Sequence, residues 1–141
     1  MVLMALNANQ KRAVAVTLRL LEERLVEIER MIDQDEEGIL YHRVARLSPE
    51  QREKMDMLIA AMRGQIRRAA ERFHLPQDER DAAREIVGIL TLSWESLEDI
   101  RPHKLGAYGD VDPALKETLD PIVQELIHLL FRLEAIARAK S

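Results

Sequence analysis

The chain has 141 residues, no cysteine and a formal net charge of −4. It is long enough for one domain with its own core, and it lacks the thiols for a disulfide framework, a thiolate metal site or a cysteine nucleophile. A negative net charge argues against general nucleic-acid affinity, and the apolar start, residues 1–6, is too short for a signal peptide or a membrane span. We therefore expect one domain over residues 1–141, in a cytoplasmic protein that binds neither DNA nor membranes.

The first predicted helix begins near Asn7, which can form a capping box with Gln10 three residues later. Its apolar side chains recur at alternating steps of four and three residues, the spacing of one face of an amphipathic helix. They are Val14, Leu18, Leu21, Leu25, Ile28 and Ile32. Residues 38–47 (GILYHRVARL) are apolar enough to pack along the helices as a short extra turn of helix.

The second predicted helix has a strong start at Ser48, with Pro49 at the first helical position and Gln51 placed for another capping box. Pro76 ends it. Its apolar side chains have the same spacing as those of the first helix, and they are Met55, Ile59, Met62, Ile66, Ala69 and Phe73.

Two further series of this period predict a third and a fourth helix. The third series consists of Ala83, Val87, Leu90, Trp94 and Leu97, and the fourth of Leu119, Ile122, Leu126, Leu129, Leu133 and Ile136. Asp112-Pro113 starts the fourth helix, and Pro121 either kinks it or marks its true beginning. Because short connections favour antiparallel neighbours, the sequence predicts an all-α, up-down-up-down antiparallel four-helix bundle with a short extra helical turn after the first helix.

Antiparallel packing would give this bundle one basic and one acidic end. Residues 1–20, 61–90 and 128–141 would meet at one end with twelve basic and six acidic side chains, a net charge of +6, and the remainder carries −10. The split is either the chance distribution of solvated helix faces, or a docking feature for a charged partner or for head-to-tail self-association. The candidate partner-binding residues are Arg63, Arg67, Arg72, Arg101, His103, Lys104 and Tyr108.

The third and fourth helices carry more apolar residues than one packed stripe requires, since a stripe of about 100° suffices for a bundle helix. The surplus residues are expected to be partly exposed, and their concentration on two consecutive helices favours a homodimer that buries them against a second copy. The candidate oligomer interface consists of Ile89, Leu92, Ile127, Leu130 and Phe131.

Two Glu-x-x-His pairs, Glu71 with His74 and Glu125 with His128, have the spacing used by di-iron bundle proteins. Those proteins need the ligands on inward faces at one height, whereas both pairs here point away from the apolar series of their helices. The two pairs also differ in height by roughly 15 Å at the rise of an α-helix. We therefore expect no metal site and no cofactor.

Arg68 and His74 are separated by five residues in an arginine-rich helix. This spacing resembles the signature of HEPN-type ribonucleases, which are four-helix proteins common in toxin–antitoxin systems. In that family the Arg and the His meet across a dimer and cleave RNA without metal, the Arg holding the phosphate and the His acting in acid–base catalysis. The family usually has a polar residue directly after the Arg, whereas this chain has Ala69, and a solvated helix end explains the same residues.

The stretch from Trp94 to Pro113 is the least generic part of the chain and admits two interpretations. Trp94 lies in the third apolar series and is expected in the core, and Leu105 and Tyr108 can fold back to plug the end of the bundle. Alternatively, Arg101, His103, Lys104 and Tyr108 form a basic and aromatic recognition loop. A structural role can account for each distinctive residue of this stretch, which favours the plug.

These patterns predict a non-enzymatic helical-bundle protein that acts through protein–protein interaction, as a homodimeric adaptor or a subunit of a complex. The alternative is a metal-independent HEPN-like ribonuclease using Arg68 and His74 at the basic end, the one case in which RNA is a partner. A small-molecule pocket between the helices is less favoured, because no apolar series turns a polar group inward to bind a ligand.

Overall fold

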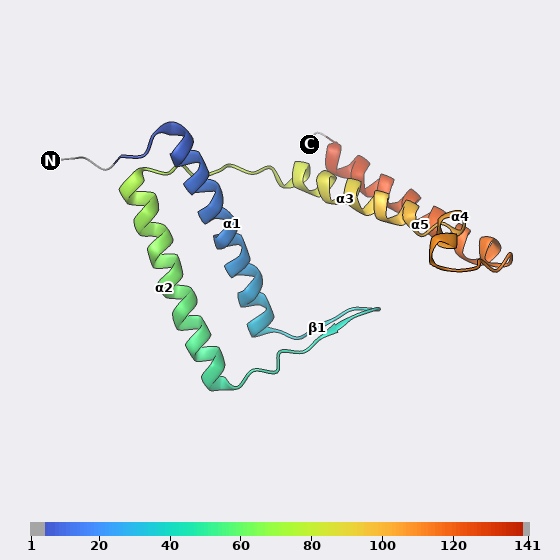
Figure 1. Cartoon of the computed structure of the whole chain (residues 1–141), viewed down its shortest axis with the longest axis horizontal. Coiled ribbons are helices and arrows are strands. Elements are labelled where there is room, and N and C mark those ends of the chain that lie inside the picture. The colour runs from blue at the N-terminus through green and yellow to red at the C-terminus, as the bar shows by residue number, and fades with distance from the viewer. Residues whose placement is uncertain (1–4, 140–141) are drawn as a thin grey trace. The chain divides into compact units, whose positions relative to one another are not determined.

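The computed structural model describes residues 5–139, so residues 1–4 of the apolar start and Lys140 of the basic end lie outside the described residues. It confirms the all-α class. Along the chain lie α1 (Ala8–Asp33), β1 (Glu36–Glu37), β2 (His42–Arg43), α2 (Pro49–Phe73), α3 (Ala82–Asp99), α4 (Pro102–Leu105), the 3₁₀ turn η1 (Gly106–Tyr108) and α5 (Leu115–Arg138), as Figure 1 shows. Between residues 5 and 139, no helix is long and apolar enough to cross a membrane.

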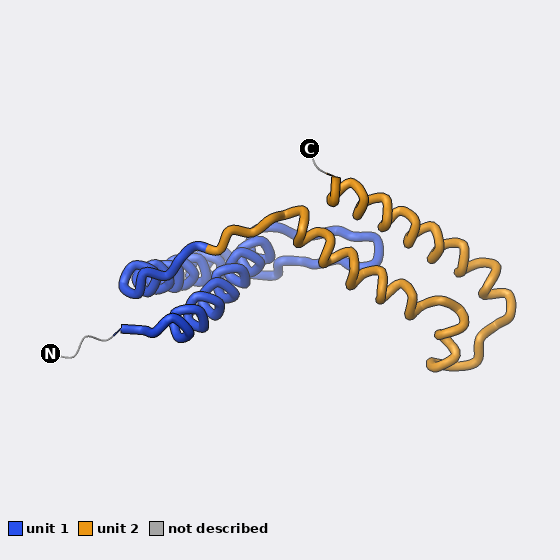
Figure 2. Tube along the Cα trace, turned by 90° about the horizontal axis from the view of Figure 1, so that it is seen from above, with its two compact units in different colours: residues 1–77 blue, residues 78–141 orange. Residues whose placement is uncertain are grey.

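The chain divides into two compact units, residues 1–77 and 78–141 (Figure 2). Each unit is built on one antiparallel pair of long helices, α1 with α2 in the first and α3 with α5 in the second. Antiparallel packing of sequence neighbours is therefore confirmed inside each unit. The assembly of both pairs into one four-helix bundle, and a single domain over residues 1–141, stay predictions.

The predicted starts of the first two helices are confirmed by their hydrogen bonds, whereas the last helix, predicted to start at Asp112-Pro113, begins at Leu115. The Gln10 N–H donates to Asn7 Oδ1 over 2.8 Å and the Asn7 N–H donates to Gln10 Oε1 over 3.0 Å. Ser48 and Gln51 form the same reciprocal pair at the start of α2, over 3.1 and 2.8 Å. Pro121 lies inside α5, so this helix begins before the proline and runs through it.

The core of the first unit follows the predicted apolar series in part, since Ile28, Met55 and Met62 of those series are exposed. Leu25, Ile32 and Ile59 are buried. Leu21, Leu47 and Ile66 pack against them. At the edge of this core the Arg63 guanidinium donates to the Glu29 carboxylate over 2.7 Å and ties α2 to α1. These hydrogen bonds lower the pKa of Glu29 and raise that of Arg63.

The extra helical turn predicted for residues 38–47 is wrong, because this segment folds with β1 and β2 as a β-hairpin. Glu36 pairs with Arg43 and Glu37 with His42 across two antiparallel strands of two residues each. Gly38 donates its N–H to the Tyr41 carbonyl over 2.9 Å, and a Cβ at Gly38 would clash with the Tyr41 ring. Strands this short show no alternation of apolar and polar residues from which they could be predicted.

Tyr41 reports on the integrity of this hairpin. Its hydroxyl donates to Glu36 Oε1 over 2.7 Å, and this bond to a carboxylate raises the pKa of Tyr41 above the ordinary tyrosine value. The folded-state pKa is raised, so the bond contributes stability below the unfolded pKa of about 10 and loses it as the pH rises through the folded pKa. We expect Glu36→Gln to lower the pKa of Tyr41, measured by the ultraviolet absorbance of tyrosinate in a Tyr108→Phe background. An unchanged titration curve would contradict the hydrogen bond.

The fourth predicted apolar series does not form the core of the second unit. Val123 and Ile127 are buried against α3, and Leu119 and Leu130 are partly buried beside them. Leu119 is the only member of the predicted series among these residues. The third predicted apolar series agrees better with the burial on α3, where four of its members are partly buried: Ala83, Val87, Leu90 and Leu97.

Candidate functional site

The most extensive feature of the second unit is an exposed apolar stripe along α5. It runs over the length of the helix at steps of four and three residues and consists of Ile122, Leu126, Leu129, Leu133 and Ile136. Successive residues of an α-helix are about 100° apart, so the centre of this stripe lies about 120° around α5 from the packed residues Val123 and Ile127. The apolar surface of α5 is therefore about twice as wide as one packed stripe requires.

A second stripe on α3 extends this surface. Its residues Ile86, Ile89 and Leu92 are exposed, and so is Ile100, the residue directly after the end of α3. Viewed down each helix from its N-terminus, the exposed stripe is displaced from the packed side in the same rotational direction on α3 as on α5. Because the two helices run antiparallel, the two stripes lie on one face of the pair, which we call the α3–α5 apolar face.

The structure separates the five residues predicted to form the oligomer interface. Ile89 and Leu92 are exposed and belong to the α3–α5 apolar face. Ile127 is only 3% exposed, so the expectation that it lies at the surface is wrong, and Leu130 is partly buried beside it. Both residues face α3 inside the unit. Phe131 is exposed and packs on Trp94, with 6.2 Å between the ring centroids.

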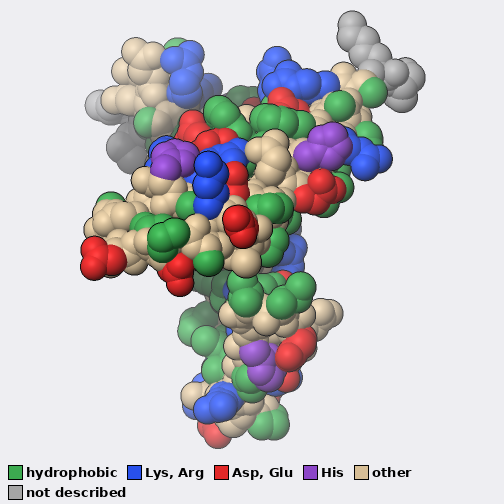
Figure 3. All heavy atoms as spheres, turned by 90° about the vertical axis from the view of Figure 1, so that its right-hand side faces the viewer, with side chains coloured by type: hydrophobic (Ala, Val, Ile, Leu, Met, Phe, Trp, Pro, Cys, Tyr) green, Lys and Arg blue, Asp and Glu red, His purple; other side chains and the backbone are tan. Residues whose placement is uncertain are grey.

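The first unit exposes a comparable surface. Leu20, Ile28 and Met31 of α1 and Met55, Leu58 and Met62 of α2 are exposed large apolar residues. The same rotational argument places them on one face of the helix pair, which we call the α1–α2 apolar face. Figure 3 shows hydrophobic side chains at the molecular surface, between charged ones. Each unit thus presents one packed and one uncovered apolar face.

The total surface area shows how much remains uncovered. The chain has a mass of 16.3 kDa and exposes 11911 Å². Two separate compact units of half that mass would together expose about 9,000 Å², so the excess is about 3,000 Å². One partner of an obligate homodimer contributes about 1,000–2,500 Å² to its interface. The excess is large enough for such an interface.

The connection between α3 and α5 is anchored by Arg101. Its guanidinium donates to Glu98 Oε2 over 3.0 Å, to Asp120 Oδ1 over 3.0 Å and to Gln124 Oε1 over 2.8 Å. The hydrogen bond to Glu98, and after it the one to Asp120, raises the pKa of Arg101. Arg101 therefore joins the end of α3 to α5, a structural position that a recognition residue would not need.

The other distinctive residues of this connection differ from the predicted plug. Trp94 is exposed rather than in the core, and Tyr108 is 86% exposed, so it does not close the end of the helix pair. His103 is exposed too, and exposed Lys104 lies 3.3 Å from Asp99. The segment forms α4 and η1, which keep their own hydrogen bonds. Leu105 is partly buried, in agreement with the predicted plug, whereas Tyr108 points outward and contradicts it.

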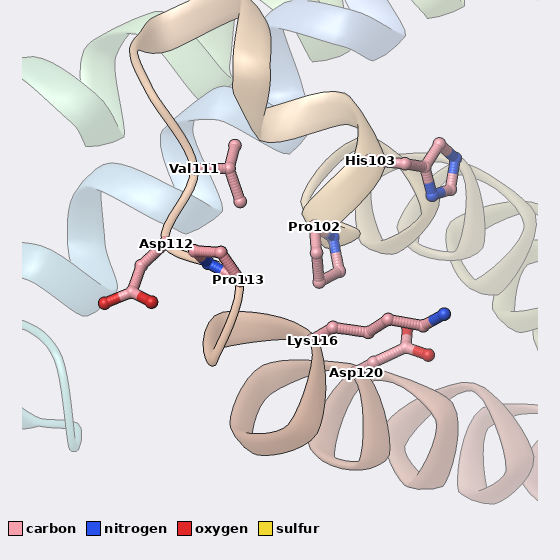
Figure 4. Close-up of a pocket in the computed structure, with 7 residues that line it drawn as sticks. All are labelled: Pro102, His103, Val111, Asp112, Pro113, Lys116 and Asp120. Atoms are coloured by element: carbon pink, nitrogen blue, oxygen red, sulfur yellow. The ribbon is translucent and has the colours of Figure 1, made fainter.

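A pocket of about 440 Å³ lies beside this connection (Figure 4). Pro102, Val111 and Pro113 form its apolar walls, and Lys116 and Asp120 lie next to each other on α5 below Pro102. Asp120 already accepts from Arg101, and Lys116 supplies a cationic side chain to the lining. The pocket has no polar group buried within it, so its walls do not define the chemistry of a ligand.

The basic residues in the second half of α2 fall into two groups. Arg63 is paired with Glu29, whereas Arg67, Arg68 and Arg72 are exposed. His74, directly after the last helical residue Phe73, adopts the left-handed conformation (φ 51°). The Leu75 N–H donates to the Ala70 carbonyl over 2.9 Å and completes the cap of the helix. Within residues 5–139, no hydrogen bond or ion pair joins Arg68 to His74.

The two Glu-x-x-His pairs lie at the surface. Glu71, His74, Glu125 and His128 are all exposed. Among residues 5–139, no three His, Asp or Glu side chains come together as metal ligands would. We found no family model that matches the chain, and no curated protein or solved structure that is similar to it.

Proposed function

We propose that this chain is a non-enzymatic interaction protein that works as a homodimer, either as an adaptor or as a subunit of a complex. The α3–α5 apolar face carries the proposal. Nine large aliphatic side chains are exposed on it, and such a concentration of exposed apolar residues on one face is typical of a protein–protein interface. In a symmetric dimer each copy contributes this same face, and a two-fold axis relates the two faces that are in contact.

In the proposed dimer, α3 and α5 of one copy pack on α3 and α5 of the second as an antiparallel four-helix bundle. The up-down-up-down bundle predicted for a single chain is a competing way to cover the same residues, since it places the α1–α2 apolar face on the α3–α5 apolar face. The excess surface of the chain is at least as large as one partner's share of an obligate interface, which is the area that the dimer requires.

The test is the mass in solution at micromolar concentration, by sedimentation equilibrium, of the wild type and of Leu129→Lys. Leu129 is exposed in the middle of the α5 stripe, so the substitution leaves the α3–α5 helix pair folded but places an unpaired charge in the interface. We expect a dimeric wild type and a variant whose dimer is weakened more than about 100-fold. His128→Lys, at an exposed position one residue away and outside the stripe, is the control and should stay dimeric.

Two results would overturn the proposal. A wild type that is strictly monomeric at micromolar concentration removes the dimer, and loss of helicity in Leu129→Lys without any dimer supports the single-chain bundle instead. A wild-type dimer that Leu129→Lys leaves intact shows that another surface holds the copies together.

The ribonuclease alternative has no observation of its own in its favour. His74 has a structural role as the left-handed residue at the end of α2, and Arg68 is one of several exposed arginines there. We therefore do not propose it.

A further inference from the structure

The first unit carries on α1 a pattern of four exposed residues whose spacing is the same in both chain directions. These residues follow one another at steps of four, three and four, and they are Leu20, Arg24, Glu27 and Met31. They lie within about 60° of one another around the helix, so they form one stripe on the α1–α2 apolar face. The stripe has an apolar residue at each end and two opposite charges in its centre.

The two central charges pair with each other inside the chain. Arg24 Nη1 lies 3.1 Å from Glu27 Oε1, and the two side chains are 67% and 50% exposed. An exposed ion pair of this kind contributes little to stability. When apolar side chains cover such a pair, both charges lose water, and the cost of their desolvation is repaid only where further opposite charges meet them. The centre of the stripe therefore decides which surface can cover it.

A second copy of α1, placed antiparallel to the first, supplies those opposite charges. The pattern has its midpoint between residues 25 and 26. About that midpoint, an antiparallel copy brings Arg24 opposite Glu27 and Leu20 opposite Met31, and each of these contacts occurs twice in the pair. The α3–α5 apolar face does not match the stripe in this way, because the exposed residues of its two stripes are aliphatic.

The charges of the whole first unit favour the same arrangement. Residues 27–56 carry nine acidic and five basic side chains, a net charge of −4. Residues 5–26 and 57–77, in the other half of the helix pair, carry three acidic and eight basic side chains, a net charge of +5. In an antiparallel pair with its two-fold axis at residues 25 and 26, the acidic half of each copy is level with the basic half of the other.

The exposed Met62 of α2 lies at the height of this axis. Ile59 packs in one core with Leu25 and Ile32, and Met62 follows Ile59 by about one turn, which places it level with residues 24–27 of α1. A two-fold axis at this height brings Met62 of one copy against Met62 of the other. Unbranched thioether side chains adapt readily to such a contact.

We propose that the α1–α2 apolar face binds the same face of a second copy. The two α1 helices lie antiparallel, with the Arg24 guanidinium of each copy on the Glu27 carboxylate of the other, and the two α2 helices pack antiparallel beside them. The inference rests on the proposed function only in that both require self-association, and it assigns the first unit a contact surface of its own. Where this contact and that of the α3–α5 apolar face share one two-fold axis, the assembly stays a dimer.

The first test reverses one central charge at a time in the full chain. Arg24→Glu leaves two acidic residues in the centre of the stripe, and Glu27→Arg leaves two basic ones. Each variant alone turns both attractions between the copies into repulsions, so we expect its dimer to be at least about 30-fold weaker than that of the wild type in sedimentation equilibrium. An equimolar mixture of the two variants, with different affinity tags, restores opposite charges at both positions. More than about nine-tenths of the dimers in the mixture should contain both kinds of chain, against one half for random pairing.

The mixture separates a contact between copies from an effect inside one chain. Mixing cannot restore the pair of residues 24 and 27 within either variant, so recovery reports on the second copy alone. Glu22→Arg is the matched control, because it makes the same change of charge as Glu27→Arg at an exposed position about 140° around α1 from Glu27. Mixed with Arg24→Glu, this control should pair at random.

The second test uses the absence of cysteine from the chain. A Leu20→Cys chain with one affinity tag is mixed and refolded with a Met31→Cys chain carrying another. Mild oxidation should produce a disulfide-linked pair of differently tagged chains, because the proposed contact places these two positions opposite each other. Val26→Cys in place of Met31→Cys, at an exposed position on another side of α1, should give little product.

The outcomes separate this inference from the proposed function. A dimer that depends on Leu129 but pairs at random in the charge-reversal mixture and forms no disulfide overturns the α1–α2 contact and keeps the proposed function. Recovery in the mixture, for a dimer that Leu129→Lys leaves intact, does the reverse. If Arg24→Glu pairs as well with Glu22→Arg as with Glu27→Arg, net charge alone drives the mixing and the contact is overturned.

Discussion

Ile127→Asn is expected to unfold the second unit, whereas Leu126→Asn, one position earlier, is expected to leave it folded. Ile127 is 3% exposed and Leu126 is 44% exposed. The first substitution removes a buried side chain and leaves an amide without a partner, at a combined cost of about 4 kcal/mol or more. A unit of this size is stabilised by only about 3–10 kcal/mol. The second substitution affects only a residue of the α3–α5 apolar face.

The measurement is the far-ultraviolet circular dichroism of both variants in water and through a urea titration, together with their mass in solution. Ile127→Asn should lose helical signal or unfold at much lower urea. Leu126→Asn should keep the wild-type signal as a weakened dimer. Equal destabilisation by the two substitutions would show that the rotational setting of α5 differs from the structure, because neighbouring residues lie about 100° apart around the helix.

Leu25→Ala is expected to destabilise the first unit by about 2–5 kcal/mol, because it opens a cavity in the centre of that unit's core. Leu25 is 2% exposed and lies with Ile32 and Ile59 between α1 and α2. Val26→Ala, at the next position, removes part of a side chain that is 47% exposed, and it should change the free energy of unfolding by less than about 0.5 kcal/mol.

Urea denaturation monitored by circular dichroism gives both values from the shift in midpoint at constant slope. If the units unfold separately, the transition of the second unit should be unchanged in Leu25→Ala and serves as an internal control. A midpoint shift of similar size in both variants would mean that α1 is not packed on α2 through Leu25.

Features set by near neighbours in the chain could be predicted. The capping boxes of α1 and α2 form within three residues, and Pro49 and Pro76 act through their own backbone geometry, so the helix ends fell close to their predicted places. The packed series of α1 was largely identified because its flanks are charged, although Ile28 is exposed.

The β-hairpin of β1 and β2 could not be predicted in the same way. Its two strands pair only two residues each, and its tip is apolar, which is the composition expected of a buried segment. What organises the hairpin is a set of contacts across the turn, above all Tyr41 over Gly38 and its hydroxyl on Glu36, and none of these has a sequence period.

By itself, the sequence determined that four long amphipathic helices form and where they begin and end, because capping, proline and helical periodicity act over a few residues. The tertiary structure alone decided which side of each helix is packed. On α5 two apolar series overlap, one containing Leu126 and the other Ile127, and both satisfy the helical period equally well. Only the position of α3 selects the series containing Ile127 for the core and leaves the other as the α3–α5 apolar face.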